Sequence, residues 1–394
     1  MTIDGFGPLP VARPAAVADL CDIVRSAAAD GSALYPVGGG TMLGYGLPPT
    51  KPGMAVDMRG LDRVIDYPAR DMTVTVQAGL TVGKLAELLR AERQHLPVDV
   101  PLHDRATIGG ALATNASGPR RFGYGTLRDY VIGISLVNDL GQEVKGGGRV
   151  VKNVAGYDLM KLYTGSLGTL GIISQVTFKV PPAPESSRWL VVDTVAANVP
   201  AVLAALQSTK TRPRAITVRG RTGDDCSVVV GFEDNAKAVE WQAVQFVEEL
   251  PDRLRGGVHD LSATDAVALR DFPLSGDASL TFKANLLPAQ TWAFCQQAMA
   301  AADVSLNAHA GNGIVVGHVH GDLTAERVAS MLQGLIAFAA MAHGNVVVTR
   351  CPPAWKSVVP VWGRPTGDRD LMKAVKDKLD PKRVFNPGRF VNGI

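Results

Sequence analysis

The stretch from Tyr35 to Gly44 (Tyr-Pro-Val-Gly-Gly-Gly-Thr-Met-Leu-Gly) constrains the fold of this chain more than any other. Its three consecutive glycines allow backbone conformations that a side chain would forbid. They also leave successive N–H groups free to converge on an anion. The glycine spacing does not match the Rossmann fingerprint, and no Gly-Lys-Ser/Thr follows as in a P-loop. The stretch therefore predicts a loop that holds a diphosphate through backbone groups, with an ordinary surface turn as the alternative.

Two further glycine-rich stretches favour the phosphate interpretation. One runs from Thr107 to Gly118 (Thr-Ile-Gly-Gly-Ala-Leu-Ala-Thr-Asn-Ala-Ser-Gly), and the other runs from Gly165 to Ile173. Together with residues 36–41 and with Asn-Pro-Gly-Arg at 386–389, they resemble the FAD-binding domain of the vanillyl-alcohol-oxidase-type (PCMH-type) flavoproteins. Within that superfamily, residues 151–159, 362–363 and 386–390 are similar to the FAD-binding subunit of glycolate oxidase (glycolate dehydrogenase).

The resemblance implies which residues hold the cofactor. The first glycine stretch would meet the pyrophosphate, the second would follow the ribityl chain, Ile172 would meet the adenine side, and Asn386 would lie near the isoalloxazine. The implied cofactor-binding residues are Pro36, Val37, Gly38, Gly39, Gly40, Thr41, Met42, Thr107, Ile108, Gly109, Gly110, Thr114, Asn115, Ser117, Gly118, Gly171, Ile172 and Asn386. Gly39→Val is expected to abolish FAD binding by filling the space that the phosphate needs.

Several members of the superfamily attach FAD covalently through a histidine that directly follows the glycines of the first loop. Thr41 occupies that position here, and no cysteine lies near the Thr107-Ile108-Gly109-Gly110 motif in sequence. A hydroxyl lacks the nucleophilic ring nitrogen of histidine. FAD is therefore expected to be bound non-covalently.

The pattern of apolar residues predicts an α+β fold. The family resemblance implies a PCMH-type FAD-binding domain of two α+β subdomains, with an antiparallel-sheet cap or substrate domain over the flavin. Pro181-Pro182-Ala183-Pro184 indicates a stiff linker. The predicted divisions are residues 1–182 for the FAD-binding domain, 183–362 for the cap or substrate domain, and 363–394 for a segment that returns to the flavin domain.

Periodicity predicts the individual elements. Helices are expected at residues 16–29, 81–93, 198–208, 235–250, 288–302, 324–342 and 371–379, and strands at 33–35, 72–78, 130–137, 172–180, 189–195, 215–219, 226–232, 280–286, 304–309, 313–320 and 345–350. Beyond the linker the order suggests two βαββα passes, which favours an antiparallel sheet with helices on one side. The stretch between the two passes reads as irregular.

A hairpin at residues 305–320 carries the candidate catalytic residues. Asn312-Gly313 is a strong hairpin turn signal. Strand alternation then places Ser305, Asn307 and His309 on the same face as Val316, His318 and His320. Related 2-hydroxy-acid flavoenzymes have an acidic residue within this turn and a Glu-His-Gly downstream, whereas this chain has Asn312 and Ala342-His343-Gly344. We therefore predict catalytic roles for His309 and His318 and no bound metal, with an ordinary polar strand face as the alternative.

Arg350, at a strand end, is the candidate for recognising a substrate carboxylate, with Lys356 nearby. Arginine suits this task because its guanidinium can pair with a carboxylate through two parallel hydrogen bonds.

Composition limits the classes of partner. The net charge of +3 makes no case for nucleic acid or an anionic membrane. No apolar run is long enough to span a bilayer, and the first residues lack the features of a signal peptide. A cytoplasmic protein is expected, with peripheral attachment to the inner membrane through partner subunits as the alternative. The four cysteines are too widely spaced for an iron–sulfur cluster, so any such cluster must belong to another protein.

These observations predict the FAD-binding subunit of a glycolate (2-hydroxy acid) dehydrogenase complex. Hydride would pass from glycolate to FAD, and electrons would leave through a partner iron–sulfur subunit. The second hypothesis is a non-catalytic electron-relay or assembly subunit beside a second FAD-containing subunit that oxidises the substrate. A third is a nucleotide-binding module without flavin.

Overall fold

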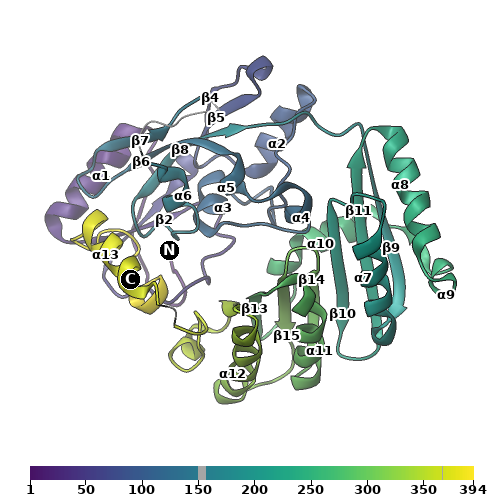
Figure 1. Cartoon of the computed structure of the whole chain (residues 1–394). Helices are drawn as coiled ribbons and strands as arrows, with labels where there is room; N and C mark the ends of the chain where they lie inside the picture. Colours follow the sequence, from purple (N-terminus) through teal and green to yellow (C-terminus); the bar gives the residue numbers. More distant parts are fainter. Residues whose placement is uncertain (150–156, 366) are drawn as a thin grey trace.

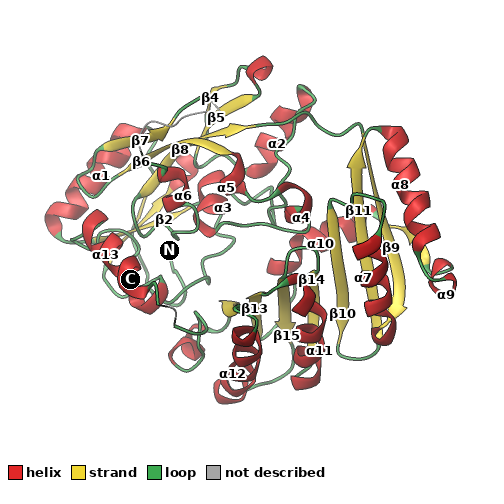
Figure 2. Cartoon of the chain, viewed as in Figure 1, coloured by secondary structure: helices red, strands yellow, loops and turns green. Residues whose placement is uncertain are grey.

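The computed structural model describes residues 1–149, 157–365 and 367–394, which form two lobes (Figures 1 and 2). The N-terminal lobe contains two sheets and receives the C-terminal segment. The second lobe contains a single large sheet. Of the stretch 151–159 that carries part of the family resemblance, residues 151–156 lie outside the described residues.

The N-terminal lobe combines a small parallel sheet, in the order β1-β3-β2, with an antiparallel sheet in the order β4-β5-β8-β6-β7. The strands are β1 (Val11–Ala12), β2 (Ala33–Val37), β3 (Gly53–Asp57), β4 (Val64–Asp66), β5 (Thr73–Gln77), β6 (Val131–Val137), β7 (Glu143–Gly147) and β8 (Ile172–Lys179). The helices are α1 (Val17–Asp30), α2 (Val82–Ala91), α3 (Ile108–Thr114), α4 (Arg121–Tyr124), α5 (Leu127–Tyr130) and α6 (Leu159–Tyr163).

Alternation along β5 explains its place in the antiparallel sheet. Val74 and Val76 are fully buried and belong to the same apolar cluster as Phe178 of β8. The hydroxyls of Thr75 and Thr177 lie 2.9 Å apart on the opposite face. The period-2 pattern of the sequence is therefore used on both faces of the sheet.

The second lobe is an eight-stranded antiparallel sheet in the order β12-β9-β11-β10-β14-β15-β13-β16. Its strands are β9 (Ser186–Val195), β10 (Ala215–Arg221), β11 (Asp225–Asp234), β12 (Val258–Asp260), β13 (Leu280–Asn285), β14 (Val304–His309), β15 (Ile314–Val319) and β16 (Asn345–Arg350). Its helices are α7 (Val199–Ser208), α8 (Ala236–Glu249), α9 (Asp252–Arg255), α10 (Ala263–Asp271), α11 (Thr291–Ala301) and α12 (Ala325–Met341), with the 3-10 turns η4 (Phe272–Leu274) and η6 (Pro353–Ser357).

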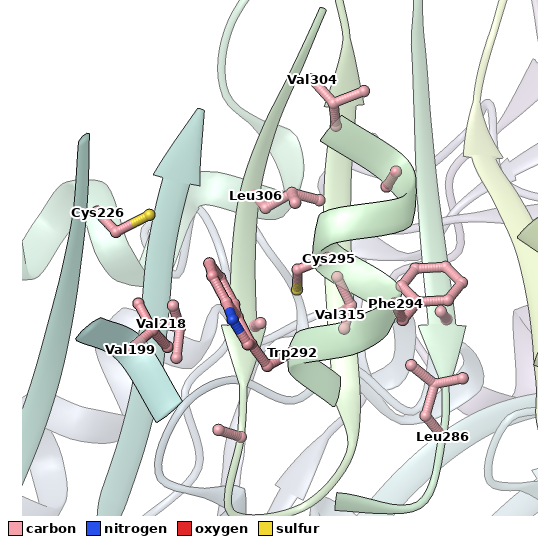
Figure 3. Packing of buried hydrophobic residues seen from close by; sticks show 14 of the residues in the cluster. Val199, Val218, Cys226, Leu286, Trp292, Phe294, Cys295, Val304, Leu306 and Val315 are labelled. Carbon is pink, nitrogen blue, oxygen red and sulfur yellow. The ribbon is translucent and has the colours of Figure 1, made fainter. Parts of the chain in front are cut away.

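The strand order is mirrored about the β10–β14 junction. On each side of it, the first, third and second strands of one βαββα pass follow in this order toward the junction, as β9-β11-β10 on one side and β13-β15-β14 on the other. Helices α7, α8, α11 and α12 bury their apolar residues against one face of the sheet. Figure 3 shows this packing, with Trp292, Phe294 and Cys295 of α11 beside Val315 and Leu306. The predicted antiparallel sheet with these helices on one side is confirmed.

Helix α10 lies on the opposite face of the sheet, in the stretch that the sequence suggested to be irregular. Its Leu269 packs against Val191 of β9 and Val229 of β11. The chain then passes through η4 directly into β13. The face of the sheet that carries the polar residues of the 305–320 hairpin is therefore also covered.

The C-terminal segment lies against the N-terminal lobe. In α13 (Arg369–Leu379), the fully buried Lys376 donates to Asp380 at 2.6 Å and to the carbonyls of Thr169 and Phe385. The N–H of Leu34 in β2 donates to the carbonyl of Val384 at 2.6 Å. The strand that feeds the glycine loop is thus held from its far side by residues near the end of the sequence.

Candidate functional site

An elongated cleft runs along the N-terminal lobe between the glycine loop (residues 36–44) and helix α3. Its two overlapping parts share Gly38, Thr107 and Leu167. Ile172 and Ile173 of β8 line one part, and Tyr45 and Arg389 line the other. The largely apolar walls are typical of a cofactor site.

The first two glycines are required by close packing of the loop against the chain behind it. A Cβ on Gly38 would lie 2.0 Å from Oγ1 of Thr107, and a Cβ on Gly39 would lie 1.8 Å from the carbonyl oxygen of Arg105. The expected reason for the effect of Gly39→Val is therefore wrong. The substitution would displace the loop from Arg105, because that space is already occupied by the protein's own backbone.

The loop presents unused backbone donors. Among the described residues, none accepts a hydrogen bond from the N–H groups of Gly39, Gly40 or Thr41. Gly40 has a φ of +69°, a left-handed conformation that favours glycine. Successive free N–H groups in such a turn form a concavity for an anion, so the loop fits a diphosphate.

A buried ionic cluster holds the carbonyl groups of residues 43–47, which continue the glycine loop. Arg389 donates to the carbonyls of Leu43, Tyr45 and Leu47. Lys356 of η6 donates to the intervening carbonyls of Gly44 and Gly46, each at 2.6 Å.

Both cations of this cluster contact the carboxylate of Asp4, Lys356 at 2.6 Å and Arg389 at 3.3 Å. All three side chains are almost completely buried. The ammonium group of Lys356 thus donates to Asp4, Gly44 and Gly46 inside the N-terminal lobe. The prediction that it lies near a substrate carboxylate is wrong.

Most of the predicted cofactor-binding residues line the cleft. They are Pro36, Val37, Gly38, Gly39, Gly40, Thr41, Met42, Thr107, Gly109, Gly110, Thr114, Gly171, Ile172 and Asn386. Asn386 has its own partners, because its N–H donates to Leu34 and its amide nitrogen donates to the carbonyl of Leu167 at 2.7 Å.

Four predicted residues do not line the cleft in the structure. Ile108 points into the core. Asn115 ends α3 in a left-handed conformation, and Gly118 packs on Asp99, where a Cβ would lie 2.6 Å from the Asp99 Cβ. Ser117 lies between them and is half-buried. These residues determine how α3 ends and where the following chain starts.

A second group of polar residues lies on the face of the second lobe's sheet that is opposite to α7, α8, α11 and α12. The β14–β15 register pairs Ser305 with His318 and His309 with Ile314, so the predicted common face is confirmed. His309 and His318 are each only 3% exposed, which excludes a solvated strand face for them. Lys283 of β13 lies in the same cross-strand row as Val316.

His309 lies in a positively charged, desolvated environment. The pKa of His309 is lowered to about 3, mainly by burial and in addition by the charges of Lys283 and Arg121. Burial also lowers the pKa of Lys283 to about 8, with a smaller contribution from Arg121. Within the described chain, neither Lys283 nor Arg121 forms an ion pair, and Nδ1 of His309 has no hydrogen-bond partner. Two cations therefore act on a neutral imidazole, and the carboxylate of Asp129 partly offsets the charge of Arg121.

His318 and Arg350, the other two candidate catalytic residues, are engaged with backbone in this structure. Nε2 of His318 donates to the carbonyl of Phe272 at 2.6 Å, and its Nδ1 lies 2.9 Å from the hydroxyl of Thr281. Arg350 donates to the carbonyls of Ser275 and Gly276 at 3.1 and 3.0 Å. Both ring nitrogens of His318 are thus occupied, and the catalytic assignments of these two residues remain predictions.

The comparisons with known proteins agree with the cleft. Residues 8–147 match the family described as "FAD binding domain". The chain is 34% identical over 177 residues to glycolate oxidase subunit GlcD of Bacillus subtilis, and 34% identical over 172 residues to subunit GlcE of Escherichia coli. The family match and the cleft together identify the chain as an FAD-binding flavoprotein.

The coverage of these relatives is partial. The matches span 44% of this flavoprotein and 38% of the Bacillus subunit, and 43% of this flavoprotein and 49% of the Escherichia subunit. A D-2-hydroxyglutarate dehydrogenase of Xanthomonas citri matches over 97% of this chain and 89% of its own length, at 26% identity. A solved structure of alkyldihydroxyacetonephosphate synthase has a TM-score of 0.72 and 17% identity over 98% of this chain and 78% of its own, which shows the shared fold.

The lining of the cleft supports non-covalent attachment of FAD. No histidine or cysteine lines it among the described residues. Burial raises the pKa of Tyr45, the phenol at one end, to about 12, so it stays protonated and weakly nucleophilic. We expect acid precipitation of the flavoprotein to release all FAD into the supernatant. Flavin retained in the washed pellet would show a covalent bond.

The sequence did not indicate every residue that forms the cleft. Tyr45 and Leu167 line it, as do Val100 and Pro101 on the opposite wall. Leu167 lies within the glycine-rich stretch 165–173, although it was not itself named as a binding residue. Nothing in the sequence marks Tyr45, Val100 or Pro101, since they reach the cleft through the packing of loops. Arg389 was part of the quoted C-terminal motif, but its partners could not be read from that motif.

The described residues contain no helix long and apolar enough to cross a membrane. They also contain no group of three or more histidine, cysteine, aspartate or glutamate side chains placed to hold a metal ion.

Proposed function

We propose that this flavoprotein oxidises a small 2-hydroxy acid such as glycolate, as the FAD-binding subunit of a multi-subunit dehydrogenase. The observation that carries the proposal is the half-buried cationic site formed by Lys283 and Arg121, in which Lys283 has no ion-pair partner among the described residues. An ammonium group without an ion-pair partner in a desolvated site attracts an anion strongly. The names of the relatives, which include glycolate oxidase subunits and D-lactate dehydrogenases, supply the substrate class.

The site supplies what binding of a 2-hydroxy acid requires. Lys283 and Arg121 would bind the carboxylate, and they come from different lobes, β13 and α4. Helix α4 follows closely in sequence after Ala116, which lines the FAD cleft. The proposed substrate site therefore lies at the junction between the cap and the FAD-binding lobe. Its enclosure favours a small acid, because His309 is only 3% exposed.

The residues of the site would also manage the proton of the substrate hydroxyl. When bound, FAD accepts the hydride from the hydroxyl-bearing carbon. His309 is neutral at physiological pH, so it can accept the hydroxyl hydrogen through a ring nitrogen. A bound carboxylate would raise the pKa of His309, because it offsets the positive charges of Lys283 and Arg121.

Anaerobic mixing tests the proposed activity directly. The FAD-loaded chain is mixed with glycolate or D-lactate without oxygen, and the flavin absorbance is followed. Bleaching within seconds to minutes supports substrate oxidation by this chain. A flavin that stays oxidised with both acids, yet bleaches with dithionite, would reject it.

A second function is favoured by the state of the histidines. His309 with a pKa near 3 is a weak base, and both ring nitrogens of His318 are occupied. A non-catalytic subunit that relays electrons or assists assembly would need no base. In that case the flavin bleaches only when a second FAD-containing, substrate-oxidising subunit is added.

Partner subunits follow from either function. Electrons must leave the reduced flavin, and the four cysteines of this chain are all buried. We propose that a separate iron–sulfur subunit receives them within a cytoplasmic complex. Isolation of the native complex and measurement of its iron content would test this.

The pH dependence of substrate capture should report Lys283. The carboxylate is attracted by the ammonium form, which is present below the pKa of about 8 and is lost as the pH rises through it. We expect kcat/KM to be level below pH 8 and to fall about tenfold per pH unit above it. Lys283→Arg should move this limit upward, because arginine stays protonated. An unchanged limit in Lys283→Arg would assign it to another group.

A further inference from the structure

A short segment connects the polar face of the cap sheet, opposite to α7, α8, α11 and α12, with the wall of the FAD cleft. We call this segment, residues 270–276 at the end of α10 and through η4, the strap. We call residues 98–106 the wall loop, because Val100, Pro101 and Ala106 line the cleft. The strap contacts the wall loop on one side and the residues of the cap sheet on the other.

On the flavin side, Asp271 holds the wall loop through a single backbone group. Its Oδ1 accepts a hydrogen bond from the N–H of Leu102 at 2.8 Å. The carbonyl of Leu102 in turn accepts from the N–H groups of Arg105 and Ala106, at 2.9 and 2.8 Å. The carbonyl of Arg105 is the atom on which Gly39 packs. An unbroken series of contacts thus leads from Asp271 to the glycine loop.

The conformation of Leu102 shows why this anchor matters. Its φ is +51°, a left-handed conformation that costs a non-glycine residue of order 1 kcal/mol. Such a conformation persists only when neighbouring contacts impose it. The bond to Asp271 is one of these contacts, and the side chain of Arg270 adds another at 3.1 Å from Nδ1 of His103.

On the cap side, the strap is fixed by two of the three residues that the sequence indicated as catalytic. His318 donates to the carbonyl of Phe272 at 2.6 Å, and the two rings lie 4.3 Å apart. Arg350 donates to the carbonyls of Ser275 and Gly276. Neither His318 nor Arg350 lines the FAD cleft.

We propose that the strap sets the position of the wall loop, and with it the affinity for FAD, so that Asp271, His318 and Arg350 are positioning residues of the FAD site. His318 and Arg350 act through the strap backbone, and Asp271 acts through Leu102. The proposal rests on FAD binding alone. It therefore stands or falls independently of the substrate and of the 2-hydroxy acid activity proposed above.

The experiment measures the Kd for FAD of the apoprotein by quenching of flavin fluorescence, and the Tm of the apoprotein separately. Asp271→Ala removes the hydrogen bond from Leu102 and also the two that the Arg270 guanidinium donates to the same carboxylate, at 2.8 and 3.0 Å. It should weaken FAD binding about tenfold, the size expected from losing the charge-assisted hydrogen bond that holds the wall loop. Asp271→Asn should retain most of the affinity, because its amide oxygen still accepts from Leu102. His318→Ala should weaken FAD binding to a similar extent.

The double variant Asp271→Ala/His318→Ala tests whether the two residues act through the same segment. Its loss of affinity should be clearly smaller than the product of the two single losses, since contacts in one series are not additive. Asp303→Ala is the matched control, because Asp303 also pairs with an arginine of the cap, Arg221, but at an exposed site far from the strap in sequence. Its Kd should equal that of the wild type.

Two results would overturn the proposal. One is an unchanged Kd for FAD in His318→Ala, because a residue that serves only the substrate leaves FAD affinity intact. The other is a fall in affinity that follows the Tm of the apoprotein equally in Asp271→Ala and Asp303→Ala, which indicates loss of general stability. If Asp271→Ala does not fold, Asp271→Asn and Arg350→Lys are measured in the same way. We expect a wild-type Kd for FAD in both variants. A loss of affinity in Asp271→Asn as large as that in His318→Ala would overturn the role of the Leu102 bond.

Discussion

The Gly110→Leu variant is expected to fold normally and to be purified without FAD. Gly110 is exposed to the cleft on helix α3, and a Cβ there meets only Oγ1 of Thr107, at 3.2 Å. A leucine side chain would extend into the space of the cofactor. The Kd for FAD should rise by at least about 100-fold, which corresponds to a loss of about 3 kcal/mol of binding free energy.

Stability and affinity should change in opposite directions in this variant. Leucine has a higher helix propensity than glycine, so the Tm of the apoprotein should stay equal or rise. Gly334→Leu on α12 is the matched control, since a Cβ at that position meets nothing within 4 Å. Gly334→Leu should bind FAD like the wild type. Normal flavin content in Gly110→Leu would show that the cofactor lies elsewhere.

Lys283→Met should remove 2-hydroxy acid oxidation while leaving FAD bound. The variant keeps the length of the side chain and removes the ammonium group that has no ion-pair partner in the described chain. Losing a desolvated, charge-assisted contact to the carboxylate costs about 3 to 4 kcal/mol. The expected fall in kcat/KM is therefore about 100- to 1000-fold, and it is measured as the rate of flavin bleaching against acid concentration.

Controls separate a loss of substrate binding from a loss of structure. Lys179→Met removes a lysine of the N-terminal lobe that lies over the Tyr130 ring. This variant should leave turnover unchanged. The affinity for FAD and the Tm of Lys283→Met should not fall, because removing a half-buried, unpaired charge relieves its desolvation cost. A variant that bleaches at the wild-type rate would remove Lys283 from the substrate site.

The glycine loop and most of the cofactor site could be predicted from sequence, because their chemistry is local. A loop that must approach another backbone needs glycine, and glycines at fixed spacing are visible in the sequence. Strands β5 and β8 were predicted closely, because one strong alternation pattern determines each. The elements of the two βαββα passes were also recovered, since each helix has an apolar face that packs on a sheet.

Helix α10 and the strap could not be predicted, and the reason lies in their pattern. Within α10, Leu269 is buried whereas Val267 is half exposed, and the remaining small residues give no clear apolar face. The partial burial of Lys283 could not be predicted either, because a lysine in a strand usually faces water. Its position depends on α4, which comes from the other lobe of the chain.

The roles of His318 and Arg350 show a further limit of sequence patterns. The alternation correctly placed His318 on the same face as His309. It could not show that the carbonyl of Phe272 would take its Nε2–H, because that partner lies in a segment without a recognisable pattern. A polar residue on the correct face may serve the backbone that covers the face rather than the substrate, and only the packed structure distinguishes the two.

The ionic cluster of Asp4, Lys356 and Arg389 has a consequence for when the cofactor can enter. During synthesis Asp4 leaves the ribosome early, whereas Lys356 and Arg389 follow hundreds of residues later. Until they arrive, nothing neutralises Asp4 or holds the carbonyl groups of residues 43–47. The FAD cleft is therefore completed only after Arg389 has been synthesised, and the glycine loop of the nascent chain stays open until then.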